Sequence, residues 1–348
     1  MLMVIFGAGA SFDSYVSRPQ DYPYPEQYRP PLTNQLFEDR PSFNSALQLF
    51  DKGQPLIAKL RYLTDSENLE QVLDRVAGES QGYAEGRKQL AAVRFYIQWV
   101  ISECEAKWHS VHMGATNHKV LLNRIEAWRA PRRESVCIVT FNYDRLIEEA
   151  LSMFDIFIEK LSHYIEHPSY QVIKLHGSVN WVHPTRLPLA NIEQRRPIEI
   201  AQHMIRNIDA ANVDLKYFAM QDTFPPNHME TRACLPSIAI PVPAKPSFEC
   251  PQDHVKVLNE AIPKVDKLII VGWRGQEHHF TELFKEVRKF ISVIIVAGNK
   301  DDARQTTAAL KAAGVDGTYT ECTEGFSKFI RDEPSIDRFL STQVSRGS

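Results

Sequence analysis

LMVIFGAGAS, residues 2–11, decides the fold class of this chain. The apolar run Leu2–Phe6 is followed, without a linker, by Gly7, Ala8, Gly9, Ala10 and Ser11. A short apolar run that ends in glycine predicts a buried parallel strand and then a tight loop. Glycine at positions 7 and 9 lets backbone amides approach a phosphate group, because a side chain there would block the approach. The stretch therefore predicts the first strand of an α/β sheet and a nucleotide-binding loop after it.

Strand and helix patterns alternate in the second half of the chain. Apolar strand patterns cover residues 136–140, 171–175, 267–271 and 293–297. Helical spacing of apolar residues covers residues 143–153, 254–262, 277–290 and 302–313. Because such alternation is typical of a parallel sheet covered on both faces, we predict an α/β fold with a doubly wound parallel sheet.

Two further segments separate the parts of this sheet. Apolar residues at three- and four-residue spacing, first over 69–76 and then over 90–108, predict an inserted helical subdomain within residues 33–130. Residues 182–250 are rich in proline and are interpreted as an irregular insertion. We expect residues 1–348 to form a single domain that contains both segments.

Composition excludes several classes of protein. The 348 residues are 43% hydrophobic and 24% charged, and 40 basic against 43 acidic residues leave a net charge of -3. This balance lacks the basic excess that binding to nucleic acid requires. No apolar run reaches the roughly 20 residues of a membrane span, and Leu2–Phe6 is too short for the core of a signal peptide. Five cysteines without paired spacing fit a reducing compartment, so we expect a cytoplasmic protein.

Polar residues follow the other predicted strands. The motif Thr140-Phe141-Asn142-Tyr143-Asp144 ends one strand, and Lys174-Leu175-His176-Gly177-Ser178 ends the next. Gly272 and Asn299 follow the two strands after that. Because ligands of open α/β sheets bind at the carboxyl ends of the strands, we expect these residues to share one site. Alternatives remain for three of them: Asn142 and Asn299 are good helix caps, and a single histidine such as His176 is often part of the core.

A standard dehydrogenase is disfavoured. Its dinucleotide fingerprint requires a third glycine where Phe12 stands, and an acidic residue about 20 positions later at the end of a second strand. The proline-rich segment 15–31 occupies the place of that second strand.

Gly-Ala-Gly-Ala-Ser, Thr-x-Asn-x-Asp and His-Gly, in this order at strand ends, resemble the NAD-binding fold of sirtuins. The resemblance covers about residues 1–15, 136–181 and 266–330 and implies a sirtuin-type Rossmann-like domain. It implies that His176 is the catalytic base and that Asn142 and Asp144 lie at the nicotinamide-side ribose. It also implies that Gly272 lies near the phosphates of NAD and that Asn299 contacts the adenosine ribose. The loop that it implies for the diphosphate consists of Gly7, Ala8, Gly9, Ala10 and Ser11.

The departures from the family concern peptide binding and zinc. Deacylating sirtuins carry a zinc ribbon with two Cys-x-x-Cys pairs, and this sequence contains no such pair. Their Gly-Ile-Pro-x-Phe-Arg segment is replaced here by Phe12-Asp13-Ser14 and the proline-rich stretch. A zinc site could still be imagined from four residues of the insertion and its flank, whose spacing matches no known ribbon: His228, Cys234, Cys250 and His254. We therefore expect no metal.

With these departures, the chain resembles the sirtuin-related NAD hydrolases of bacterial antiphage defence. The resemblance implies an NAD glycohydrolase that releases nicotinamide and ADP-ribose. The chemistry of the residues agrees, since His176 can take a proton from a ribose hydroxyl or from a water, and Asn142 can hold that water against the ribose carbon. The resemblance also implies a HerA-type ATPase as a partner. Because free NAD hydrolysis would kill the host cell, and residues 66–128 supply amphipathic helices beyond what the sheet requires, we expect regulation by assembly and a homo-oligomer. Two alternatives stay open: an NAD-dependent protein deacylase, and a sensor that binds NAD or ADP-ribose without catalysis.

Overall fold

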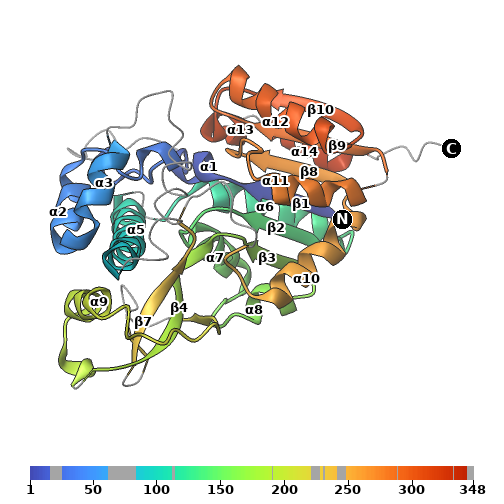
Figure 1. Ribbon diagram of the computed structural model, residues 1–348. Helices are drawn as coiled ribbons and strands as arrows, with labels where there is room; N and C mark the ends of the chain where they lie inside the picture. Colours follow the sequence, from blue (N-terminus) through green and yellow to red (C-terminus); the bar gives the residue numbers. More distant parts are fainter. Residues whose placement is uncertain are drawn as a thin grey trace.

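A six-stranded parallel sheet forms the centre of the protein, with helices on both sides (Figure 1). The computed structural model describes residues 1–15, 26–61, 84–111, 114–189, 191–220, 228–229, 232–240, 248–287, 289–331 and 333–342. The strand order is β10-β9-β8-β1-β2-β3. The bounds are β1 Leu2–Phe6, β2 Val136–Thr140, β3 Tyr170–Lys174, β8 Lys267–Val271, β9 Ile291–Val296 and β10 Gly317–Cys322. The predicted doubly wound α/β class is thereby confirmed.

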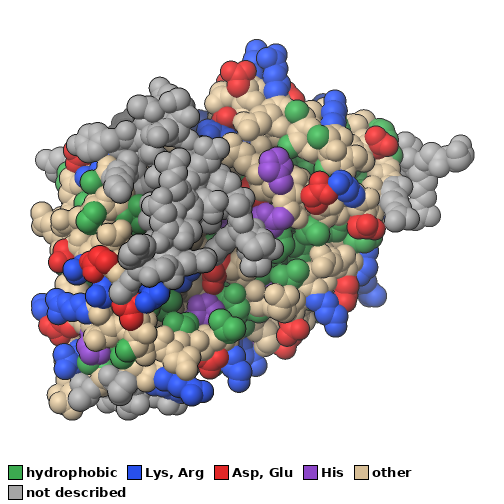
Figure 2. Space-filling view, viewed as in Figure 1, with side chains coloured by type: hydrophobic (Ala, Val, Ile, Leu, Met, Phe, Trp, Pro, Cys, Tyr) green, Lys and Arg blue, Asp and Glu red, His purple; other side chains and the backbone are tan. Residues whose placement is uncertain are grey.

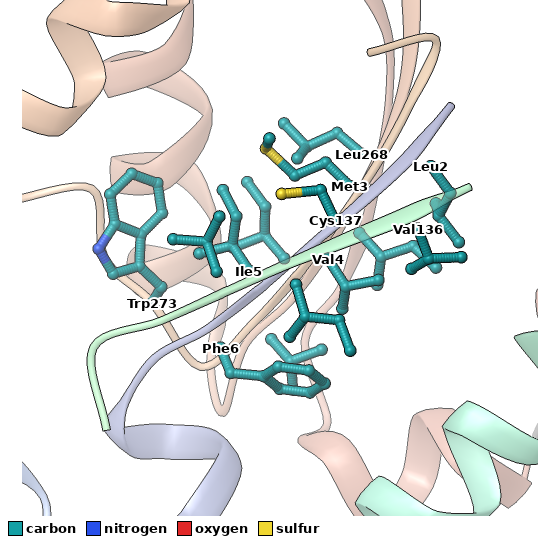
Figure 3. Close-up of a cluster of buried hydrophobic side chains, with 14 of the residues drawn as sticks. Leu2, Met3, Val4, Ile5, Phe6, Val136, Cys137, Leu268 and Trp273 are labelled. Atoms are coloured by element: carbon teal, nitrogen blue, oxygen red, sulfur yellow. The ribbon is translucent and has the colours of Figure 1, made fainter. Parts of the chain in front are cut away.

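Strand β1 lies in the middle of the sheet because all of its side chains are apolar. It pairs with β2 on one side and β8 on the other, and each of its five residues is buried. Figure 3 shows Met3 and Ile5 on one face of the sheet and Val4 and Phe6 on the other. Both faces are covered, which explains why the strand reads as a continuous apolar run rather than as an alternation. Each such side chain contributes about 1.5–3 kcal/mol on burial.

Helices from distant parts of the sequence cover the two faces. On the face of Phe6, α6 (Asn117–Arg129) packs against α13 (Phe326–Arg331) and α14 (Glu333–Ser341). The remaining helices around the sheet are α1 Ala8–Phe12, α7 Leu146–Leu151, α8 His163–Glu166, α10 Gln252–Ala261, α11 His278–Thr281 and α12 Lys300–Ala312.

A second layer lies beyond the carboxyl edge of the sheet, around its own apolar core (Figure 1). Its helices are α2 Pro41–Leu49, α3 Gln54–Arg61, α5 Ala84–Val111 and α9 Pro197–Arg206. Its antiparallel sheet has the order β5-β4-β7-β6, with β4 Gly177–Pro188, β5 Phe218–Ala219, β6 His228–Met229 and β7 Arg232–Ile238. Helix α5 packs against β7, β4 and α9, so one core joins the two inserted segments.

The structure differs from the sequence analysis in these insertions. The segment 182–250, expected to be irregular, supplies most of the antiparallel sheet and α9. Its prolines did not exclude strands, because Pro184 and Pro236 lie within β4 and β7 of a small sheet with irregular register. Within 33–130, helix α6 covers the central sheet and does not belong to the second layer. The apolar spacing over 69–76 lies outside the described residues.

Boundaries of the predicted elements around the sheet agree closely, with two exceptions. Strands 136–140 and 267–271 are confirmed residue for residue. The helix expected over 143–153 is the shorter α7, Leu146–Leu151, followed by a 3-10 segment, Ser152–Phe154. The helix expected over 277–290 is the short α11 followed by a 3-10 segment, Glu282–Glu286.

Positive and negative side chains are mixed on the described surface. Figure 2 shows Lys and Arg side chains interspersed with Asp and Glu over the described part of the visible face, in keeping with the net charge of -3. None of the described helices is long and apolar enough to cross a membrane.

Burial of His118 gives a prediction about stability. The ring of His118 packs against Phe6 and Phe326, and neither ring nitrogen has a hydrogen-bond partner among the described residues. This burial lowers the pKa of His118 to about 3, with Glu148 acting weakly in the opposite direction. Below about pH 6.5 the unfolded chain therefore takes up a proton that the folded chain does not, and stability falls as the pH drops.

We expect His118→Leu to stabilise the protein by about 1 kcal/mol at pH 7, because two unpaired nitrogens are removed. Between pH 7 and pH 5 the wild type should lose about 2 kcal/mol more than this variant, at roughly 1.4 kcal/mol per pH unit. Urea unfolding at both pH values measures the difference, with His278→Leu, at an exposed position of α11, as the control. An equal pH dependence in His118→Leu and wild type would contradict this account.

Candidate functional site

The loop after β1 and the end of β8 touch through their backbones. The Gly7 amide donates to Val271 O at 2.9 Å, and the Gly9 amide donates to Gly272 O at 3.1 Å. A Cβ on Gly7 would lie 2.5 Å from Gly272 O, and a Cβ on Gly272 would lie 2.4 Å from the Ala10 nitrogen. Gly272 also has a φ of +63°, which side chains rarely adopt. These glycines are therefore required by contact between two loops of the protein, whether or not a phosphate approaches them.

Asn142 is held in one orientation by the loop after β1. Its Nδ2 donates to Gly7 O at 2.9 Å and to the Ser11 hydroxyl at 2.8 Å. The Ser11 hydroxyl donates in turn to Asp144 Oδ2 at 2.5 Å. Both N–H bonds of the amide are thus used within the protein, and Oδ1 is the atom with which Asn142 can accept a hydrogen bond from a ligand.

The predicted diphosphate loop and the Thr-x-Asn-x-Asp motif are therefore one network. Asp144 completes it, since its Oδ1 accepts from the Leu146 amide at 3.2 Å at the start of α7. The sequence analysis assigned Ser11 and Asp144 to NAD contacts, whereas their side chains are here bonded to each other. The structure thus places Ser11 in direct hydrogen-bond contact with Asn142, and Asp144 behind Ser11.

His176 lies beside this network. Its ring centroid is 5.1 Å from that of Phe141 and 6.3 Å from that of Tyr143, the two residues that flank Asn142. The Phe141 ring is itself stacked on Trp273, at 5.5 Å and an interplanar angle of 1°. Aromatic packing therefore places the imidazole against the two residues that flank Asn142, at the carboxyl edge of the sheet.

Gly177 explains why glycine follows this histidine. It has a φ of +81°, and a Cβ there would lie 1.9 Å from Ser237 O on β7. The Ala239 amide also donates to His176 O at 2.9 Å. The second layer thus fixes the backbone of the His-Gly pair from the other side.

Asn299 lies apart from this network, at the start of α12. Its Oδ1 accepts from the Asp302 amide at 2.9 Å, and its Nδ2 donates to Asp302 Oδ2 at 3.0 Å. Asn299 is thus the N-cap of α12, which was the alternative role considered for it. A contact to an adenosine ribose stays a prediction, because the exposed side chain would have to leave its cap to make it.

In the stretch 272–277, which follows β8, Trp273 and Glu277 are bonded to each other. The Trp273 indole N–H donates to Glu277 Oε2 at 2.5 Å, and its carbonyl accepts from the Thr306 hydroxyl at 2.8 Å. Trp273 is almost fully buried. It thereby fixes the Phe141 ring on which His176 rests.

Two buried charges next to the site escaped the sequence analysis. Lys174, which is fully buried, donates from Nζ to Asp144 O and to Glu148 Oε1. Glu105 of α5 accepts from the Arg145 amide and from Arg145 Nε, both at 2.8 Å. The pKa of Glu105 is raised to about 7, mainly by burial; Arg145 opposes this rise, and Asp144 and Glu149 contribute to it.

The sequence contains a pattern that could have indicated each of these buried charges. Lys174 interrupts an apolar strand, and a charge at the end of a buried strand requires a partner. Gln98, Ser102 and Glu105 repeat at four- and three-residue spacing beside the apolar stripe of α5, which is typical of one helix face.

The four imagined zinc ligands do not form a described site. The His228 side chain lies outside the described residues. Cys234 of β7 and Cys250, just before α10, are buried thiols, and burial raises the pKa of Cys250 to about 12. His254 donates from Nε2 to Leu161 O at 3.0 Å and lies against the rings of Tyr164 and Trp181. In the part of the chain that the structure describes, no group of three or more His, Cys, Asp or Glu side chains could hold a metal ion.

Comparison with known proteins gives distant structural likenesses only. No protein-family model matches the chain, and no curated protein matches it. Similar solved structures include a complex of a Sir2 homolog with NAD, at 14% identity and a TM-score of 0.41, covering 98% of this chain and 90% of that chain. Another is Sir2 bound to an acetylated peptide, at 14% identity and a TM-score of 0.38, covering 97% of this chain and 94% of that chain.

The glycine contact gives a matched pair of variants. We expect Gly272→Ala to destabilise the fold by roughly 2–4 kcal/mol, because the new Cβ meets the backbone of Gly9 and Ala10 at a left-handed position. Gly298→Ala is the control, since that glycine is exposed and a Cβ there would meet nothing within 4 Å. Thermal unfolding of the two variants measures the difference. Equal melting temperatures would show that the loops can separate without cost.

Proposed function

We propose that this chain is an NAD glycohydrolase, which hydrolyses NAD to nicotinamide and ADP-ribose. The observation that carries the proposal is the fixed orientation of Asn142, whose two flanking residues, Phe141 and Tyr143, pack against the His176 ring. Because Gly7 and Ser11 take both amide hydrogens, Asn142 presents an acceptor oxygen at the sheet edge where the imidazole also lies. A hydrogen-bond acceptor and a base that reach the same water molecule are the two groups that activate it.

The chemistry needs little else. The bond between the ribose carbon and the nicotinamide nitrogen breaks, and its electron pair neutralises the cationic pyridinium, so the leaving group needs no general acid. A water oxygen forms the new bond to the ribose carbon, and His176 takes the proton that this water loses. Asn142 Oδ1 accepts a hydrogen bond from the same water and holds it against the ribose. The barrier is thus lowered mainly by position and proton transfer.

The residues around the pair divide into two roles in this proposal. Ser11 and Asp144 hold Asn142, and only through it act on the substrate. The backbone of Gly7, Ala8, Gly9 and Ala10, with Gly272 beside it, is proposed to lie along the diphosphate. Asn299 is proposed to reach the adenosine ribose.

We also propose that the activity serves antiphage defence and is regulated by assembly. A hydrolase of NAD without control would consume the NAD of its own cell, so the activity requires a gate. The support is the motif resemblance, which suggests a homo-oligomer and a HerA-type ATPase as the first partner to test. Light scattering of the purified chain, alone and with such an ATPase, tests this; a fully active monomer that binds no ATPase would contradict it.

Substitution of the two central residues tests the activity. We expect Asn142→Ala and His176→Ala each to lower the rate of nicotinamide release by about two to four orders of magnitude, the usual contribution of such a group. Affinity for NAD should change only a few-fold, because neither substitution removes the loop backbone. Nicotinamide release and NAD binding by calorimetry measure the two effects.

Matched controls are an asparagine and a histidine on helices outside the proposed site. Asn207→Ala removes an amide at the end of α9, and His163→Ala removes an imidazole from α8, which precedes β3. Both should retain wild-type turnover. Wild-type turnover in His176→Ala would refute the assignment of the base. Release of nicotinamide only when an acyl-lysine peptide is present would replace hydrolysis by deacylation.

A further inference from the structure

One peptide bond next to the site is held between two buried, opposite charges. Lys174 Nζ donates to Asp144 O, and the Arg145 amide donates to Glu105 Oε2 at 2.8 Å. The carbonyl of Asp144 and the amide of Arg145 belong to the same peptide group. Its positive end therefore points at a carboxylate and its negative end at an ammonium group.

Burial makes both contacts strong. Lys174 has no exposed surface, and Glu105 is only 4% exposed. Hydrogen bonds to charged groups are about twice as strong as neutral ones, and they are strengthened where water is excluded. A peptide dipole aligned between two such charges cannot rotate without breaking both bonds. The backbone direction at Asp144 is thereby fixed.

The two charges come from different layers of the protein. Lys174 ends β3 of the central sheet, whereas Glu105 belongs to α5, which packs in the second core. The held peptide is connected to the proposed active site through side chains, since Asp144 accepts from Ser11 and Ser11 accepts from Asn142. The position of α5 against the sheet edge therefore affects the orientation of Asn142, through Glu105, the Asp144–Arg145 peptide and Ser11.

We infer that Glu105 is a positioning residue, which fixes Asn142 through the Asp144–Arg145 peptide and makes activity depend on the docking of α5. The claim that activity depends on Glu105 rests on the proposed function. The claim that Glu105 and Lys174 hold the Asp144–Arg145 peptide is independent of it. Lys174 acts as the second half of the same clamp.

Charged groups around Glu105 set the pH range in which the clamp works. They are Arg145 and Asp144 on the loop, Glu149 on α7, and His109, which lies one turn further along α5 and pairs with Glu149 at 2.9 Å. Because burial raises the pKa of Glu105 to about 7, the carboxylate is present above that pH and is protonated below it. The bond to the Arg145 amide should therefore weaken as the pH falls through about 7.

The first experiment observes the peptide directly and needs no catalysis. In protein labelled with ¹⁵N-arginine, the Arg145 amide resonance, assigned with Arg145→Lys, should titrate with a midpoint near pH 7 in the wild type. Glu105→Gln should remove this titration. Glu103→Gln, the same change on the same helix at a half-exposed position, should retain it. An Arg145 resonance that is unaffected by Glu105→Gln would overturn the clamp.

The second experiment measures its effect on the reaction. We expect Glu105→Gln to lower kcat about 10- to 100-fold near pH 8.5 with KM nearly unchanged, the size of effect that slight misplacement of a reacting group produces. The ratio of wild-type to variant kcat should approach one near pH 5.5. Taking the ratio at each pH removes any pH dependence that the two proteins share.

Further outcomes separate positioning from stability. The melting temperature of Glu105→Gln should remain within a few degrees of the wild type, and Lys174→Met should lower kcat in the same way. A kcat ratio independent of pH, or a parallel loss of kcat and melting temperature in Glu105→Gln, would overturn the positioning role. If the wild type releases no nicotinamide while the Arg145 amide titrates as expected, the proposed function fails and the clamp stands.

Discussion

Contact between the β1–α1 loop and the end of β8 is the constraint on which the rest of the site depends. Gly7, Gly9 and Gly272 meet backbone to backbone, at distances that leave no room for a Cβ. This contact places Gly7 O and the Ser11 hydroxyl where they can accept from Asn142. Without it, the asparagine on the neighbouring strand would have no fixed orientation.

Burial of ionised groups is a further feature of this sheet edge. Taking Lys174 and Glu105 out of water costs free energy that their partners offset only when every bond is made. Lys174 and Glu105 therefore add little to the free energy of unfolding, but they favour one conformation of the backbone around Asp144. The proposed chemistry needs this specification, because a water molecule must be held within a fraction of an ångström of its line of attack.

The two layers meet at the proposed catalytic pair. His176 rests on Phe141 and Trp273 of the central sheet, while β7 of the second layer packs against Gly177. Asn142 is held from the sheet side and, through Arg145 and Glu105, from α5. The arrangement gives a partner that binds the second layer a physical route to the site, which fits the proposed control by assembly.

The sequence was sufficient to predict the central sheet and to place several candidate site residues at its carboxyl edge. Unbroken apolar runs such as Leu2–Phe6 and Lys267–Val271 specify buried parallel strands, and their carboxyl ends meet by topology alone, so Asn142, Asp144 and the glycine loop could be placed together. Tertiary structure decided what these residues touch. That Ser11 bonds Asp144, that 182–250 forms a sheet on α5, and that Glu105 reaches Arg145 all depend on contacts between distant segments, which periodicity within one segment does not contain.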